Sequence, residues 1–83
     1  MTPGSSLRAH LAELHTTPLG AERIRRNLGL GTDVQDVVAW CRNEISAEQV
    51  VISRAGKNWY VSSGGCVITV NASSYTIITA HRA

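Results

Sequence analysis

Phenylalanine is absent from this chain of 83 residues, whose aromatic side chains are those of two Trp and two Tyr. A core must therefore rest on Leu, Ile and Val, with these few rings as anchors. Hydrophobic residues still make up 43% of the chain, too many for a disordered one. We expect one domain over residues 1–83, with residues 1–4 disordered, 5–46 helical and 47–83 forming a sheet.

Acidic residues are missing from the C-terminal part of the chain. All six lie between Glu13 and Glu48, whereas residues 49–83 carry Arg54, Lys57 and Arg82. The net charge of +2 is mild and does not by itself imply a polyanionic partner.

Sequence motifs for metals, nucleotides and redox cofactors are also missing. Cys41 and Cys66 have no CxxC spacing and are too few for a zinc site, so we interpret them as small buried hydrophobes. Phosphate-binding glycine loops, HExxH and GxSxG are absent, and we predict no metal and no cofactor. No apolar run approaches the ~20 residues of a membrane span, which predicts a cytoplasmic protein without membrane contact.

Two helices are predicted before residue 30. Leu7, Leu11 and Leu14 repeat at helical spacing, which predicts a helix from Ser6 to His15 with Ser5 or Ser6 as its cap. A second helix is predicted over Pro18–Leu28, because Thr17 suits the N-cap, Pro18 the first helical position and Gly29 a left-handed C-terminus.

A third helix follows the apolar positions Val34, Val37, Val38, Cys41 and Ile45. Thr32 or Asp33 is the expected N-cap, since either side chain can accept a hydrogen bond from a free amide of the first turn.

Four runs rich in β-branched and aromatic residues make up the rest of the chain, separated by short Gly, Ser and Asn clusters. Such short turns join antiparallel neighbours. We therefore predict an α+β fold, with two to three N-terminal helices on one face of a four-stranded antiparallel meander. The predicted strands are Gln49–Arg54, Asn58–Ser62, Cys66–Asn71 and Tyr75–His81.

Alternation along these strands assigns each residue to one of two faces, although a register shift of one residue would invert the assignment. The residues predicted to face the helices are Val50, Ile52, Trp59, Val61, Ile68, Val70, Ile78 and Ala80. The other face is predicted to carry Val51, Ser53, Tyr60, Ser62, Val67, Thr69, Asn71, Tyr75, Ile77, Thr79 and His81. Hydroxyls and an imidazole on this second face suit a binding groove.

His81 is the candidate catalytic base, because an imidazole exchanges protons near neutral pH. Thr79 precedes it on the same predicted face, and Tyr60 and Lys57 could position a phosphate and stabilise its developing charge. The alternative is a polar strand end, a half-buried tyrosine and a turn lysine.

Arginines are the candidate phosphate or RNA ligands, namely Arg23, Arg26, Arg54 and Arg82. A solvated helix face explains the arginines near residue 25 almost as well.

Four segments resemble a small bacterial family of unknown function, and the resemblance covers about residues 11–82. They are Leu14–Gly20 (LHTTPLG), Arg23–Leu28 (RI and NL), Gly56–Val61 (GKNWYV) and Ile68–His81 (ITVN and SYTIITAH). More loosely, helices followed by a sheet that ends in Thr76–His81 are similar to the superfold of barnase, EndoU, colicin and RelE nucleases. That second resemblance implies a metal-independent ribonuclease, although no glutamate stands in the sheet where barnase has its base.

The first functional hypothesis is therefore a toxin-like, metal-independent endoribonuclease that acts on RNA and could be restrained by an inhibitory protein partner. The alternative is a non-enzymatic module that binds nucleic acid or protein through the same face. A third reading is a small dimer that pairs through an edge strand.

Overall fold

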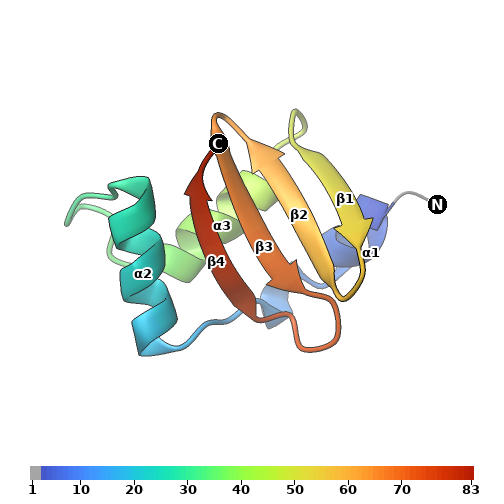
Figure 1. Cartoon of the computed structure of the whole chain (residues 1–83), viewed down its shortest axis with the longest axis horizontal. Coiled ribbons are helices and arrows are strands. Elements are labelled where there is room, and N and C mark those ends of the chain that lie inside the picture. The colour runs from blue at the N-terminus through green and yellow to red at the C-terminus, as the bar shows by residue number, and fades with distance from the viewer. Residues whose placement is uncertain (1–2) are drawn as a thin grey trace.

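The computed structural model describes residues 3–83 and has the predicted α+β fold (Figure 1). The predicted disorder of residues 1–4 falls partly on Met1 and Thr2, which lie outside the described residues; Pro3 and Gly4 are helical. The elements are α1 (Pro3–Ala9), a 3₁₀ turn η1 (Leu11–Glu13), α2 (Pro18–Leu28), α3 (Val37–Ser46), β1 (Val51–Ala55), β2 (Asn58–Ser63), β3 (Cys66–Asn71) and β4 (Ile77–Arg82).

The four strands form one antiparallel sheet in the order β1-β2-β3-β4. Two-residue turns connect the first three strands, with φ of 59° at Gly56 in one, and of 50° and 86° at Gly64 and Gly65 in the other. Positive φ at these places gives the primed turns whose twist matches that of the strands they join. The predicted meander is confirmed.

All the helices avoid one face of the sheet. Figure 1 shows α1 and α3 behind the sheet and α2 alongside β4. The space between helices and sheet is filled by a buried apolar core, whose largest fully buried side chains are Leu7, Ile24, Ile45, Ile68, Ile77, Val61 and Val70. Within residues 3–83, no helix is long and apolar enough to span a membrane.

Helix α2 has the predicted ends. The Thr17 hydroxyl accepts a hydrogen bond from the amide of Gly20 at 3.0 Å, and Gly29 adopts a left-handed φ of 65°. Both signals lie within a few residues of the helix terminus they define, so sequence alone locates them.

The other two helices differ from the prediction. The first begins at Pro3, earlier than expected, and the chain turns at His10 into η1 rather than continuing to His15. The third begins at Val37, because Asp36 and not Thr32 or Asp33 is the N-cap: its Oδ1 accepts from the amide of Ala39 at 3.0 Å.

The last strand also differs. A bulge between Thr69 and Val70 places Thr79 opposite Thr69 and Ile77 opposite Val70, which leaves Ile78 without a partner on β3. Ile77 is therefore 1% exposed and Ile78 41% exposed, the reverse of the predicted assignment.

Tyr75 was wrongly placed on the open side of the sheet. It precedes β4 with a φ of 60°, and its ring lies 5.5 Å from that of buried Trp59.

Candidate functional site

The uncovered face of the sheet carries two rows of four residues, each row crossing all four strands. One row is Ser53, Tyr60, Thr69 and Thr79; the other is Val51, Ser62, Val67 and His81. We call these residues, with Ile78 and the neighbouring pair Asn58 and Asn71, the open face. Figure 1 views the molecule from this side.

The centre of the open face is densely packed and its borders are apolar. Thr69 is only 6% exposed although no helix covers it, because it lies between Tyr60 and Thr79 in its row. Val51 is 68% exposed at one border and Ile78 41% exposed at the other. This face thus exposes apolar side chains without a layer above them.

One polar atom at the end of the open face lacks a partner. Asn58 Oδ1 is buried and accepts no hydrogen bond from any described residue. A buried acceptor without a donor costs free energy, so a donor from water or from a bound molecule would be stabilising here.

No Asp, Glu, Lys or Arg belongs to the open face. Arg54 and Arg82 alternate to the opposite side. Arg54 Nε donates to the carbonyl oxygen of Gly56 at 3.0 Å while its guanidinium lies 5.4 Å from the Trp59 ring centroid. Arg82 Nη2 donates to the carbonyl oxygen of Leu28 at 2.8 Å. The face is therefore uncharged apart from the imidazole of His81.

The candidate catalytic residues are only partly brought together. His81, Thr79 and Tyr60 share the open face in adjacent rows, as expected from alternation. Lys57 lies in the β1–β2 turn, beyond Asn58, whereas the row of His81 crosses β2 at Ser62. At ~3.4 Å per residue, Asn58 and Ser62 are ~13 Å apart along β2. Lys57 and His81 therefore lie at opposite ends of the sheet.

The candidate phosphate ligands on α2 lie away from the open face. Arg23 and Arg26 are exposed on this helix beside β4, and neither donates a side-chain hydrogen bond to another described residue. Arg25, between them, donates to the carbonyl oxygens of Gly31 at 2.7 Å and Val34 at 2.6 Å. Of these three arginines, Arg23 and Arg26 thus face solvent, and Arg25 binds the loop that leads to α3.

Two further arginines tie helices to backbone carbonyl groups. Arg8 donates to Ala47 at 2.9 Å, and Arg42 donates to Leu11 at 3.0 Å. Most of the basic residues therefore hold the fold together, which the sequence alone did not indicate.

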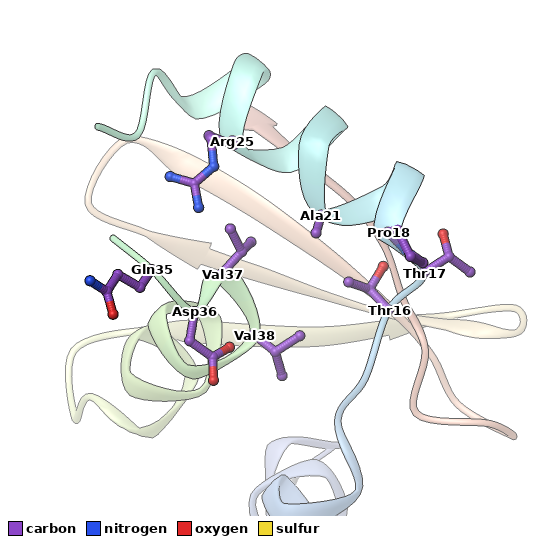
Figure 2. Close-up of a pocket in the computed structure, with 9 residues that line it drawn as sticks. All are labelled: Thr16, Thr17, Pro18, Ala21, Arg25, Gln35, Asp36, Val37 and Val38. Atoms are coloured by element: carbon purple, nitrogen blue, oxygen red, sulfur yellow. The ribbon is translucent and has the colours of Figure 1, made fainter. Parts of the chain in front are cut away.

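A groove of about 440 Å³ runs between α2 and α3 (Figure 2). Arg25 points into the space between the two helices, and Thr16, Thr17 and Asp36 line the groove. Three of its polar groups are already used within the chain, because Arg25 binds loop carbonyls and Thr17 and Asp36 cap the two helices.

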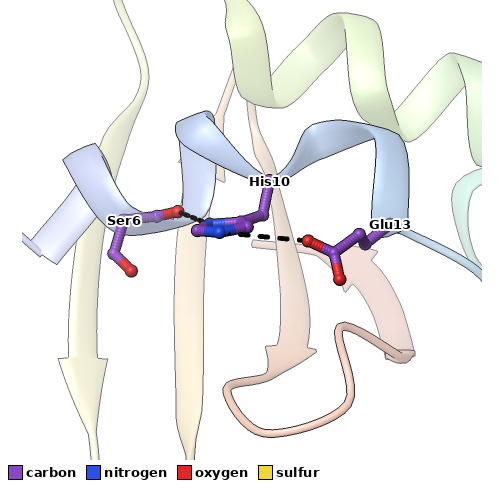
Figure 3. Close-up of polar contacts among 3 residues, drawn as sticks. All are labelled: Ser6, His10 and Glu13. Carbon is purple, nitrogen blue, oxygen red and sulfur yellow. Dashed lines mark hydrogen bonds and ion pairs between the residues drawn. The ribbon is translucent and has the colours of Figure 1, made fainter.

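His10 belongs to a cluster near η1 that the sequence did not suggest. Its Nδ1 donates to the carbonyl oxygen of Ser6 at 2.9 Å, and Nε2 lies 3.9 Å from Glu13 Oε2 (Figure 3). The ring is 5.2 Å from that of Tyr75, which in turn contacts Trp59. These contacts anchor the backbone at Tyr75.

His15 heads a chain of hydrogen bonds along the β3–β4 loop. Its Nδ1 donates to the carbonyl oxygen of Glu13 at 2.9 Å, and its Nε2 lies 3.0 Å from Thr76 Oγ1. Thr76 Oγ1 lies 2.7 Å from Ser74 Oγ, which donates to Asn71 Oδ1 at 3.1 Å. The Leu14–Gly20 and Ile68–His81 segments thus meet in space, a contact between distant parts of the chain that no local signal predicts.

The two cysteines are poor nucleophiles. Burial raises the pKa of Cys41 to about 12, with Cys66 and Glu44 adding to the effect. Burial and Glu44 raise the pKa of Cys66 as well, against an opposing effect of Arg82. Cys66 lines a cavity of about 310 Å³ together with Trp40, Glu44 and Arg82.

Within residues 3–83, no three His, Cys, Asp or Glu side chains are grouped to hold a metal.

These features define a small α+β domain with one uncovered sheet face that lacks Asp, Glu, Lys and Arg. Residues 8–81 match the family model DUF3781, described as a protein of unknown function, and the chain belongs to this family. Membership of a family of unknown function was predicted from the sequence and is confirmed. No curated protein and no solved structure matches the chain.

Proposed function

We propose that this domain is a non-enzymatic module that binds a partner protein through its open face. The observation that carries the proposal is the absence of Asp, Glu, Lys and Arg from two complete rows of an uncovered sheet. The central parts of protein interfaces are depleted in charged residues, and the open face likewise lacks Asp, Glu, Lys and Arg.

The same observation favours a protein over a nucleic acid. Nucleic-acid affinity rests mainly on Lys and Arg contacts to phosphates. Arg54 and Arg82 are engaged on the helical side, and Arg23 and Arg26 lie on α2.

Affinity capture from a cell extract, with paired variants, tests the proposal. Val67→Glu puts a carboxylate in the centre of the open face. Leu19→Glu puts the same group on α2, where the side chain is 72% exposed. We expect one partner to be retained by the wild type and by Leu19→Glu and lost by Val67→Glu. Equal retention by all three proteins, or no retained partner, would refute the proposal.

The second candidate is the metal-independent endoribonuclease, favoured by the placement of His81 and Thr79 on one open face with Tyr60 two strands away. Neutral His81 would take the proton of a ribose 2′-hydroxyl, whose oxygen would then attack the adjacent phosphorus. A 2′,3′-cyclic phosphate would form, and the 5′-oxygen would leave with a proton from water.

Incubation with total RNA in EDTA tests this candidate. Cleavage by the wild type and by Lys57→Ala, but not by His81→Ala, is the expected result for a site that excludes the distant lysine. An absence of cleavage, or equal cleavage by wild type and His81→Ala, removes the candidate.

A further inference from the structure

The two edge strands of the sheet, β4 and β1, differ in how far other segments of the chain cover them. Along β4, the backbone at His15 pairs in parallel with Thr76, and the amide of Ile77 donates to the carbonyl oxygen of His15 at 2.8 Å. Farther along, Asn27 Nδ2 donates to the carbonyl oxygen of Ala80 at 3.2 Å, and α2 lies beside the strand (Figure 1). This edge is closed.

Among the described residues, no backbone bridge and no side-chain hydrogen bond covers the outer edge of β1, and the helix that packs against this strand is α1. β1 stands at one end of the sheet order, and four of its five residues are exposed. Edge strands that must remain unpaired usually carry a proline, a bulge or an outward charge. β1 reads VISRA, and its one charge, Arg54, is folded back onto Gly56 and the Trp59 ring.

The free hydrogen-bonding groups of β1 belong to Ile52 and Arg54. The turn Gly56-Lys57 is closed by the pair Ala55–Asn58, and the closing pair of a two-residue hairpin exchanges both backbone bonds. Because such pairs alternate in antiparallel ladders, Ser53 and Val51 also bond toward β2. The amides and carbonyls of Ile52 and Arg54 therefore point outward.

We propose that this edge pairs with β1 of a second copy of the chain, antiparallel and centred on Ser53. In this register Ser53 faces its own symmetry mate, Val51 faces Ala55, and Ile52 faces Arg54. No like charges meet, the outward amides and carbonyls of Ile52 and Arg54 bond to each other, and Val51 gains an apolar neighbour. The result is one eight-stranded sheet with a continuous open face. The inference does not depend on what the open face binds.

Cysteine crosslinking tests the register. Across the two-fold axis Ser53 forms a non-hydrogen-bonded pair with its mate, with Cβ atoms ~4.5–5.5 Å apart, close enough for a disulfide after a small adjustment. Val51 and its mate are four residues out of register, ~13 Å apart. With oxidised glutathione as the oxidant, we expect Ser53→Cys to form a covalent dimer at least ~10-fold faster than Val51→Cys. Equal rates would overturn the register.

Backbone variants test the edge itself. Arg54→Pro removes an outward amide without removing a bond to β2, whereas Arg54→Ala keeps that amide and serves as the control. By sedimentation equilibrium we expect the wild type and Arg54→Ala to give the dimer mass and Arg54→Pro the monomer mass. A monomeric wild type up to about 1 mM, or a dimeric Arg54→Pro, would overturn the proposal.

Hydrogen exchange gives a second readout that needs no folded proline variant. In the wild type, the amides of Ile52 and Arg54 should become protected as protein concentration rises. Unchanged exchange would contradict the dimer. Val67→Glu, which tests the open face, should still give the dimer mass, so the two proposals can fail separately.

Discussion

Arg82 Nη2 lies 2.8 Å from the carbonyl oxygen of Leu28, which joins the last residue of β4 to the last residue of α2. Carbonyls in the final turn of a helix have no partner within the helix, and a cation placed there is favoured by the helix dipole. This contact holds α2 beside the sheet at the end where Gly29 reverses the chain.

Replacing Arg82 should therefore weaken the fold. We expect Arg82→Ala to lower the free energy of unfolding by ~1 kcal/mol, because it removes a charge-assisted hydrogen bond that is partly exposed to solvent. Arg26→Ala removes the same side chain from an exposed site on α2 and should change stability by less than ~0.5 kcal/mol. Urea unfolding compares them, and equal effects would contradict a structural role for Arg82.

Asn71 organises the β3–β4 loop. Its Oδ1 accepts hydrogen bonds from the amides of Ser73 and Ser74 at 2.9 and 3.0 Å, and from the Ser74 hydroxyl. Asn71→Ala should lower the free energy of unfolding by ~1–2 kcal/mol, because these donors lose their acceptor. Asn71→Asp keeps an acceptor and should lose less than half as much. A larger loss for Asn71→Asp would argue against the acceptor role.

The bulge in β4 predicts unequal costs of substitution for two adjacent isoleucines. Ile77→Ala should lower the free energy of unfolding by ~3 kcal/mol, because it leaves a cavity in the core. Ile78→Ala should cost less than ~1 kcal/mol, since this side chain is on the open face. Chemical denaturation of the two variants measures the difference, and similar losses would place the bulge elsewhere.

Cys41 should make stability fall at high pH. Burial raises its pKa from 9.0 to about 12, so between these values the unfolded chain has lost a proton that the folded protein keeps. The free energy of unfolding should therefore be unaffected by Cys41 below pH 9 and decrease above it, by up to ~1.4 kcal/mol per pH unit. Cys41→Ala should lack this part of the slope between pH 9 and 11. Parallel pH profiles for the two proteins would show that the thiol is not the cause.

The parts of the fold that were predicted correctly rest on short-range signals. The cap Thr17, Pro18 and Gly29 define α2 within a few residues of its ends. Glycines in the two tight turns define the hairpins in the same way. The third helix was misplaced because Thr32, Asp33 and Asp36 can each cap a helix, and only packing selects among them.

The candidate site shows the same division. Alternation correctly assigned His81, Thr79 and Tyr60 to one face, because side chains on a strand alternate whatever surrounds it. It failed at Ile77 and Ile78, since a bulge depends on how β4 meets its neighbours. The roles of Arg54 and Arg82 were missed as well, because their carbonyl partners come close only through turns and packing.

By itself the sequence determined the fold class, the order of helices and strands, and the polar, nearly uncharged character of one sheet face, since all of these follow from periodicity and turn chemistry. Only the tertiary structure decided which end of the sheet each candidate residue occupies, which arginines are engaged by backbone carbonyls, and which edge is left open. Those outcomes depend on register and on contacts between residues far apart in the chain, such as His15 with Thr76 and Leu28 with Arg82.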